Sequence, residues 1–171
     1  MVTLLILSAL LAVLYVGAAI GAKRELPDSV SSMVYLLPKT GQWIWIVWMW
    51  MVSLLLAPAM IEAMPDSLRF IAFLTVASLM FCGAMPVVKD KKNTAHNILG
   101  VSAGILSQVC VLFICPWWLL AWLLMVALLF GSLAAFNDSV QTPRICDGKG
   151  VFVSEAICWI SITGSLFCAF L

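Results

Sequence analysis

Six apolar segments dominate this chain, and each is close to the ~20 residues that a helix needs to cross a bilayer. They cover residues 2–22, 43–63, 68–88, 95–115, 117–136 and 151–171. Because lipid offers no partner for a free backbone N–H or C=O, each segment is expected to be helical. The fourth and fifth segments meet at Pro116, where a tight turn is expected because one helix through both would be too long for any tilt.

The composition excludes a soluble domain. Hydrophobic residues make up 64% of the 171 residues and charged residues only 10%, against about 45–50% and about 25% in soluble domains. One small core cannot hide this excess. The sequence therefore predicts an all-α fold, a polytopic transmembrane bundle of six helices that forms a single domain over residues 1–171, with one short interfacial helix after the first span.

The interfacial helix is expected over residues 29–37. Val30, Met33, Val34 and Leu37 form an apolar stripe at helical spacing, and Pro38 follows it. Asp28 or Ser29 would accept a backbone N–H at its start. Such a segment is typical of a helix that lies in the cytoplasmic interface of a membrane.

The basic residues predict the orientation in the membrane. Eight of the nine lie in the first, third and fifth loops, namely Lys23, Arg24, Lys39, Lys89, Lys91, Lys92, Arg144 and Lys149. The ninth is Arg69, in the second loop. The positive-inside rule then places both termini on the non-cytoplasmic side of the inner cell membrane. A net charge of +1 also leaves no basic surface for nucleic acid.

The cysteine and histidine content excludes several kinds of metal and redox site. The six cysteines form no Cys-x-x-Cys pair, and a single histidine cannot supply a three-histidine zinc site. No resident metal or cofactor is expected. A disulfide between Cys115 and Cys168, near two span ends, stays open as an alternative to free thiols.

Three polar residues within or next to the apolar spans are the strongest candidates for a ligand site, because polar groups are costly in lipid. They are His96 and Gln108 in the fourth span and Glu155 in the sixth. The alternative for each is a structural bond between helices. Asp90, Tyr35 and Asp138 lie in or beside the loops on the same predicted side and complete the candidate set.

Small residues form stripes that allow helices to approach closely. The first span carries Gly17 and Gly21, the fourth carries Gly100, Ala103, Gly104 and Ser107, and the sixth carries Ser154, Cys158, Ser161 and Ser165. Packing seams are the simple interpretation of the glycines. If the three stripes meet, spans one, four and six would enclose a cavity open to the cytoplasm.

The segment from Ser29 to Tyr35, Asp90 before His96, and the small residues after His96 carry a resemblance. In these features the chain resembles small bacterial six-helix membrane proteins of unknown function. It is similar in outline to histidine-poor relatives of the ceramidase and adiponectin-receptor-like membrane hydrolases. Those hydrolases hold zinc with several histidines, whereas this chain has one, so the resemblance implies a fold and assigns no catalytic role.

The sequence favours a binding function and leaves three alternatives. The cavity would hold a lipid headgroup or small amphiphile, an anionic lipid above all, since lysines and arginines gather on that side. A small oligomeric transporter or channel would use Glu155 and His96 as ion ligands. A membrane-embedded lipid hydrolase and an accessory subunit are the other two. Expected partners are membrane lipid, a small-molecule ligand and a second copy of the chain, and no nucleic acid.

Overall fold

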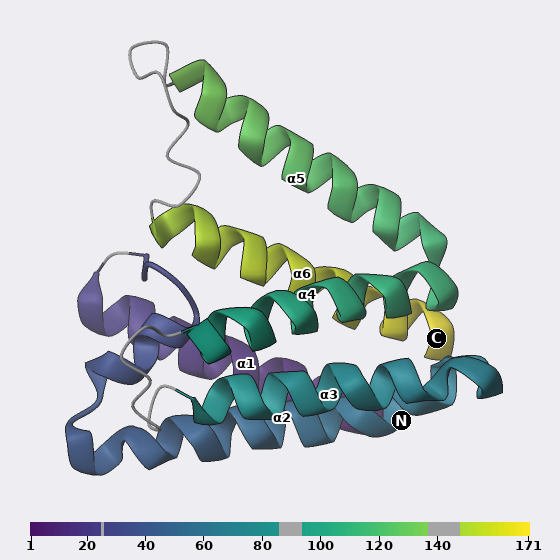
Figure 1. The fold of residues 1–171 in the computed structure, drawn as a ribbon, viewed down its shortest axis with the longest axis horizontal. Coiled ribbons are helices and arrows are strands. Elements are labelled where there is room, and N and C mark those ends of the chain that lie inside the picture. The colour runs from purple at the N-terminus through teal and green to yellow at the C-terminus, as the bar shows by residue number, and fades with distance from the viewer. Residues whose placement is uncertain (25, 86–93, 137–147) are drawn as a thin grey trace.

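A computed structural model describes residues 1–24, 26–85, 94–136 and 148–171, and this part of the chain is helical without a strand (Figure 1). The long helices are α1 (Val2–Lys23), α2 (Gln42–Ala63), α3 (Arg69–Ala84), α4 (Thr94–Ile114), α5 (Pro116–Phe136) and α6 (Gly148–Phe170). Three short 3-10 helices, η1 (Ser31–Leu36), η2 (Lys39–Gly41) and η3 (Asp66–Leu68), lie in the connections. The all-helical prediction is confirmed.

The protein is a membrane protein by the length and composition of its helices. α1, α2, α3, α4 and α6 are each long and apolar enough to cross a bilayer. α5 is a helix of 21 residues, of which the described apolar part is Pro116–Leu128. Both chain termini lie at one end of the bundle, opposite η1 and the start of α4 (Figure 1).

Most predicted boundaries agree with the helices to within three residues, and the turn at Pro116 separates α4 from α5 as expected. α3 differs, because it ends at Ala84 instead of residue 88. Residues 86–88 of that predicted span lie outside the described residues.

The predicted interfacial helix is the 3-10 helix η1, shorter than residues 29–37. Its apolar residues Met33 and Val34 are fully buried and pack against Ala19 and Trp45, together with partly buried neighbours. η1 therefore lies on α1 and α2 and does not turn this stripe toward lipid, because the neighbouring helices supply the apolar contact. The N-cap of η1 is Val30, without a side-chain cap bond, so the predicted cap at Asp28 or Ser29 is wrong. The Ser29 hydroxyl accepts the Ser32 N–H at 3.0 Å one residue before that position.

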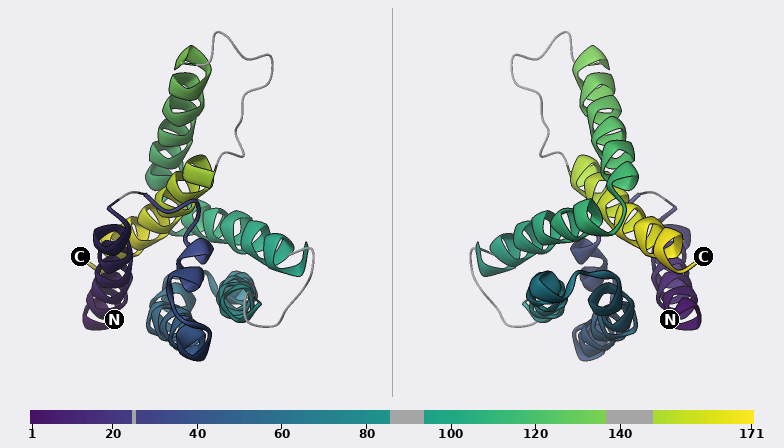
Figure 2. Two further views of the ribbon diagram at one scale, coloured as in Figure 1. Left: turned by 90° about the vertical axis from the view of Figure 1, so that its left-hand side faces the viewer. Right: turned by 90° about the vertical axis from the view of Figure 1, so that its right-hand side faces the viewer.

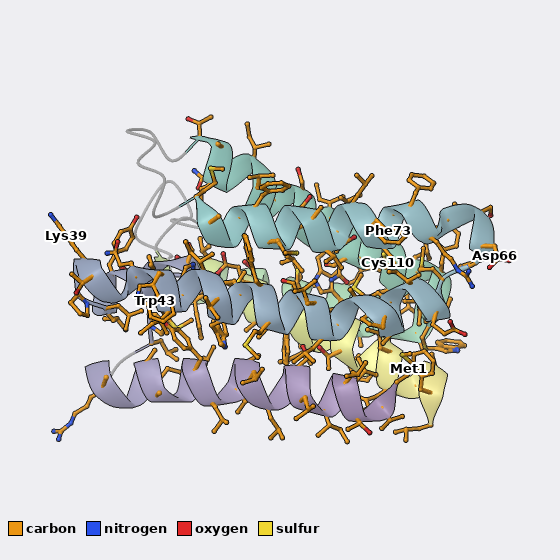
Figure 3. The ribbon with its side chains drawn as sticks, turned by 90° about the horizontal axis from the view of Figure 1, so that it is seen from below. Met1, Lys39, Trp43, Asp66, Phe73 and Cys110 are labelled. Carbon is orange, nitrogen blue, oxygen red and sulfur yellow. The ribbon has the colours of Figure 1, made fainter. Side chains whose placement is uncertain are left out.

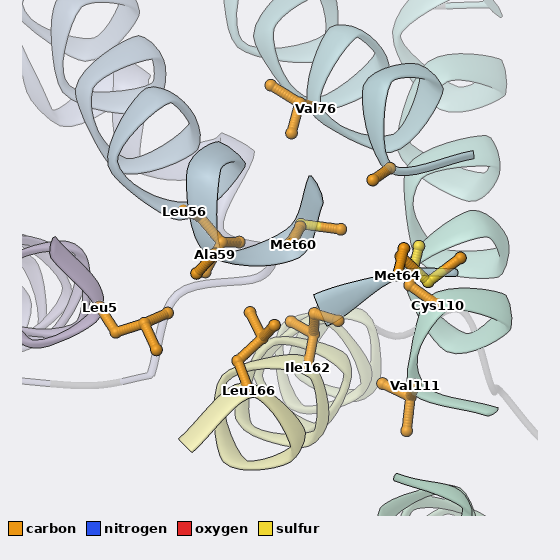
Figure 4. Packing of buried hydrophobic residues seen from close by; sticks show 11 residues of the cluster. Leu5, Leu56, Ala59, Met60, Met64, Val76, Cys110, Val111, Ile162 and Leu166 are labelled. Atoms are coloured by element: carbon orange, nitrogen blue, oxygen red, sulfur yellow. The ribbon is translucent and has the colours of Figure 1, made fainter. Parts of the chain in front are cut away.

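The main core lies between α1, α2, α3, α4 and α6, where Leu5, Met60, Val76, Cys110 and Leu166 meet (Figure 4). Outside this core, large apolar side chains project along the helices into the surroundings (Figure 3). Phe73, for example, is 59% exposed. Apolar residues that face outward at this density require hydrocarbon around the helices.

α5 is placed differently from the other long helices. It runs beside α6 and α4 near Pro116 and then diverges from them toward its C-terminal end (Figures 1 and 2). The other five pack into a bundle. This divergence leaves one side of α4 and α6 uncovered by the rest of the described chain.

The close packing of α3 against α2 depends on the absence of a side chain at Gly83. A Cβ atom built on Gly83 would lie 2.6 Å from the Cβ of Met49, on the facing helix. We expect Gly83→Ala to lower the free energy of unfolding by about 1–3 kcal/mol, the usual cost of overpacking. Denaturant titration in mild detergent measures it. Gly17→Ala on α1, where the added Cβ meets nothing within 4 Å, is the matched control, and equal stability of the two variants would contradict the packing.

Candidate functional site

Two tryptophans attach α5 to α6 in the half of the bundle that contains the termini. The Trp118 ring lies directly over Gly164, where a Cβ would come within 2.5 Å of the ring. The Trp118 indole N–H donates to the Cys168 Sγ at 3.1 Å. One turn further, the Trp122 N–H donates to the Cys158 Sγ at 3.2 Å. These contacts fix the closed end of the angle between α5 and α6.

A groove of about 530 Å³ follows from this angle, bounded by α4, α5 and α6. Its α4 wall contains Val101, Gly104, Ile105, Gln108, Val109 and Leu112, which share one helical face. Leu119, Trp122 and Val126 line it from α5, and Ser154 and Cys158 from α6. The volume lies within the ~300–1,000 Å³ typical of ligand pockets, and nearly all of these side chains are apolar.

Of the predicted site residues that the structure describes, only Gln108 lines this groove, and its amide bonds to α6. Its Nε2 donates to the Cys158 carbonyl oxygen at 3.3 Å, and its Oε1 accepts the Ser161 hydroxyl at 3.1 Å. The side chain is only 7% exposed. These bonds correspond to the structural alternative, in which a polar side chain joins two helices in lipid. Its use as a ligand contact stays a prediction.

His96 lies at the start of α4 and contacts Cys82 of α3. The His96 Nδ1 is 3.0 Å from the Cys82 carbonyl oxygen, which can only accept, so Nδ1 carries the proton. The Cys82 thiol in turn donates to the His96 carbonyl oxygen at 3.8 Å. Nδ1 is thus committed to the backbone and cannot take the thiol proton, even though it lies 3.5 Å from the sulfur. The pair joins α3 to α4.

Glu155 holds a segment from the other end of the sequence. Its carboxylate accepts the Val30 N–H at 2.6 Å, at the start of η1. We name residues 26–38 the strap, because η1 and its flanks fold over this end of the bundle with Pro27, Met33 and Val34 buried. A partly buried carboxylate therefore joins the strap to α6.

The structure thus brings some predicted residues together and separates others. His96 contacts Cys82 and Glu155 contacts Val30, and neither His96 nor Glu155 lines the groove. Tyr35 is 60% exposed on η1. Asp90 and Asp138 lie outside the described residues. Sequence reasoning missed Cys82, because a cysteine within an apolar run has the pattern of a small hydrophobic residue.

The three small-residue stripes do not meet as expected. Gly17 and Gly21 of α1 are exposed, and a Cβ on either would meet nothing within 4 Å. The stripes of α4 and α6 do face each other, through Gln108 and Ser161. The groove is consequently walled by α5 and not by α1, because α1 packs against α2 through Tyr15 and Trp48, whose rings stack at 4.4 Å.

The structure also bears on the predictions about a disulfide and about a metal site. Cys115 and Cys168 are both free thiols in the structure, so the open question of a disulfide resolves to the unbridged alternative. Among the described residues, no three His, Cys, Asp or Glu side chains gather closely enough to hold a metal ion.

No family model, curated protein or solved structure matches this chain. The resemblance to six-helix membrane proteins therefore stays a prediction, and the groove's function has to be argued from its own geometry.

The bond from Val30 to Glu155 makes a testable prediction about the strap. A hydrogen bond to a charged group contributes about 1.5–3 kcal/mol, so Glu155→Ala should raise amide exchange in residues 26–38 roughly ten- to hundred-fold. Glu155→Gln keeps an acceptor oxygen and should give a smaller rise. Hydrogen–deuterium exchange of the detergent-solubilised protein measures both. Glu62→Ala, at an exposed carboxylate of α2, is the control. Wild-type exchange in Glu155→Ala would show that this bond does not hold the strap.

Proposed function

We propose that the protein binds a membrane lipid or comparable amphiphile by placing its hydrocarbon tail in the groove between α4, α5 and α6. The observation that supports this proposal is the apolar groove of about 530 Å³, two of whose three helices, α4 and α6, are long and apolar enough to cross a bilayer. The proposal keeps six crossings, with α5 as one of them, in the inner cell membrane with both termini outside.

The depth of the groove supports a tail as its occupant. Along α4 the groove spans residues 101–112, which is roughly 16 Å at 1.5 Å per residue. It begins roughly 10 Å from the start of the helix at Thr94. At that depth the medium outside is hydrocarbon and not water. An apolar, laterally open groove in such a medium is filled by a hydrocarbon chain.

The headgroup would lie toward the end of the bundle that carries η1. The groove opens in that direction, since α5 diverges from α6 there (Figure 1). Arg24 and Lys39 are exposed at that end, and the positive-inside prediction assigns the other basic loops to the same side of the membrane. Basic groups near a membrane surface attract anionic headgroups, so the proposal favours an anionic amphiphile.

Gly104 offers a direct test, because it lines the groove and a Cβ built on it meets nothing within 4 Å. Gly104→Leu should fill the groove without a clash. The probe is a phosphatidylglycerol with a diazirine on its acyl chain, incorporated into nanodiscs. After irradiation, peptide mass spectrometry should find adducts on α4 residues 101–112 in the wild type and a roughly ten-fold loss in Gly104→Leu.

Gly17→Leu is the matched control, because Gly17 also opens to free space and does not line the groove. It should keep wild-type labelling. Lipid that merely surrounds the protein would label the exposed residues Leu10, Val13 and Leu14 of α1 as strongly as α4. Labelling of that even kind, unchanged by Gly104→Leu, would contradict the proposed function.

A further inference from the structure

The groove has one wall residue that is both large and fixed in place, which is Trp122 of α5. Its ring lines the groove, and its indole N–H donates to the Cys158 Sγ of α6 at 3.2 Å. The other α5 residues in the lining, Leu119 and Val126, are aliphatic. A bulky side chain that is bonded across the groove limits the width available to a ligand at that point.

The position of α5 itself is also fixed near Trp122. One turn earlier, the Trp118 ring rests on Gly164 and its N–H donates to Cys168. The Trp118 carbonyl oxygen accepts the Ser161 hydroxyl at 3.4 Å. Widening the groove at Trp122 would require breaking these contacts together with the bond to Cys158. Trp122 is therefore a fixed wall for any tail that lies in the groove, although the groove is open on the side that faces the surrounding lipid.

From this arrangement we infer that Trp122 is the specificity-determining residue of the groove and restricts it to slim, unbranched hydrocarbon tails. The inference rests on the proposed function, since it names the class of tail that the same site accepts. A methyl branch on the side of the tail that packs against α5 would meet the indole ring and would have to displace it. Cys158 acts as a positioning residue, because it contacts the tryptophan and sets the orientation of its ring.

Two photoprobes test the inference. Both are phosphatidylglycerols with a diazirine at the same carbon, one with a straight acyl chain and one with a methyl-branched chain. The measured quantity is the ratio of branched to straight labelling on α4 residues 101–112. Since one extra methyl group in a tight apolar pocket changes binding by about ten-fold or more, Trp122→Leu should raise this ratio roughly ten-fold.

Trp117→Leu is the matched control, because Trp117 is 77% exposed beside the same helix start and does not line the groove. It should leave the ratio at the wild-type value. Cys158→Ala removes the acceptor of the indole and should raise the ratio in part, whereas Cys158→Ser keeps an acceptor and should preserve selectivity. The two Cys158 variants therefore test the influence of Trp122 on the labelling ratio even if Trp122→Leu fails to fold.

The outcomes separate the inference from the function beneath it. If the wild type is labelled in the groove and the ratio is the same in Trp122→Leu or Cys158→Ala as in Trp117→Leu, the inference is overturned and the lipid site remains. If the wild type shows no labelling of the groove above that of α1, the proposed function and the inference fall together. A raised ratio in Trp122→Leu and in Cys158→Ala, but not in Cys158→Ser, supports both.

Discussion

Hydrocarbon cannot hydrogen-bond a backbone amide, and the whole architecture of this protein depends on that constraint. Every long apolar segment has to satisfy its own N–H and C=O groups, so each forms a helix. Even the sharp connection between α4 and α5 keeps its bonds, since the Trp118 N–H donates to the Cys115 carbonyl oxygen at 3.0 Å. Once the helices exist, the remaining question is what holds them together.

The hydrophobic effect gives little preference for helix contact over lipid contact, so close packing and interhelical bonds have to supply it. Gly83 and Gly164 provide closeness, because each receives a large neighbouring side chain. Polar side chains provide the bonds. Ser8 donates to the Val52 carbonyl oxygen at 2.9 Å, and Gln108 joins α4 to α6. Ser8 and Gln108 thus serve the packing of helices, whereas hydroxyls such as those of Ser53 and Ser165 bond within their own helices.

The same role in helix packing applies to the polar residues that were predicted to form a ligand site. Glu155, His96 and Gln108 are rare polar groups in apolar surroundings, which made them candidates for ligand contact. Each has a protein partner instead: the strap, Cys82 and α6, respectively. The feature with space for a ligand is apolar and is built mainly from ordinary membrane residues such as Val101, Ile105 and Leu112. Composition alone cannot distinguish a groove wall from a face that only meets bulk lipid.

Helix number, type and approximate length were determined by the sequence itself, because runs of about 20 apolar residues permit one local solution in lipid. The turn at Pro116 is local too, and it appears in the structure. Which helices pack against each other, and through which faces, is not determined by the local sequence. Whether Gly17 or Gly104 faces a neighbour depends on the rotation of each helix, which apolar side chains on all sides leave unspecified. Only the tertiary structure decided that α5 diverges from α6, because that angle comes from the contacts of Trp118 and Trp122 with residues 50 and 36 positions away.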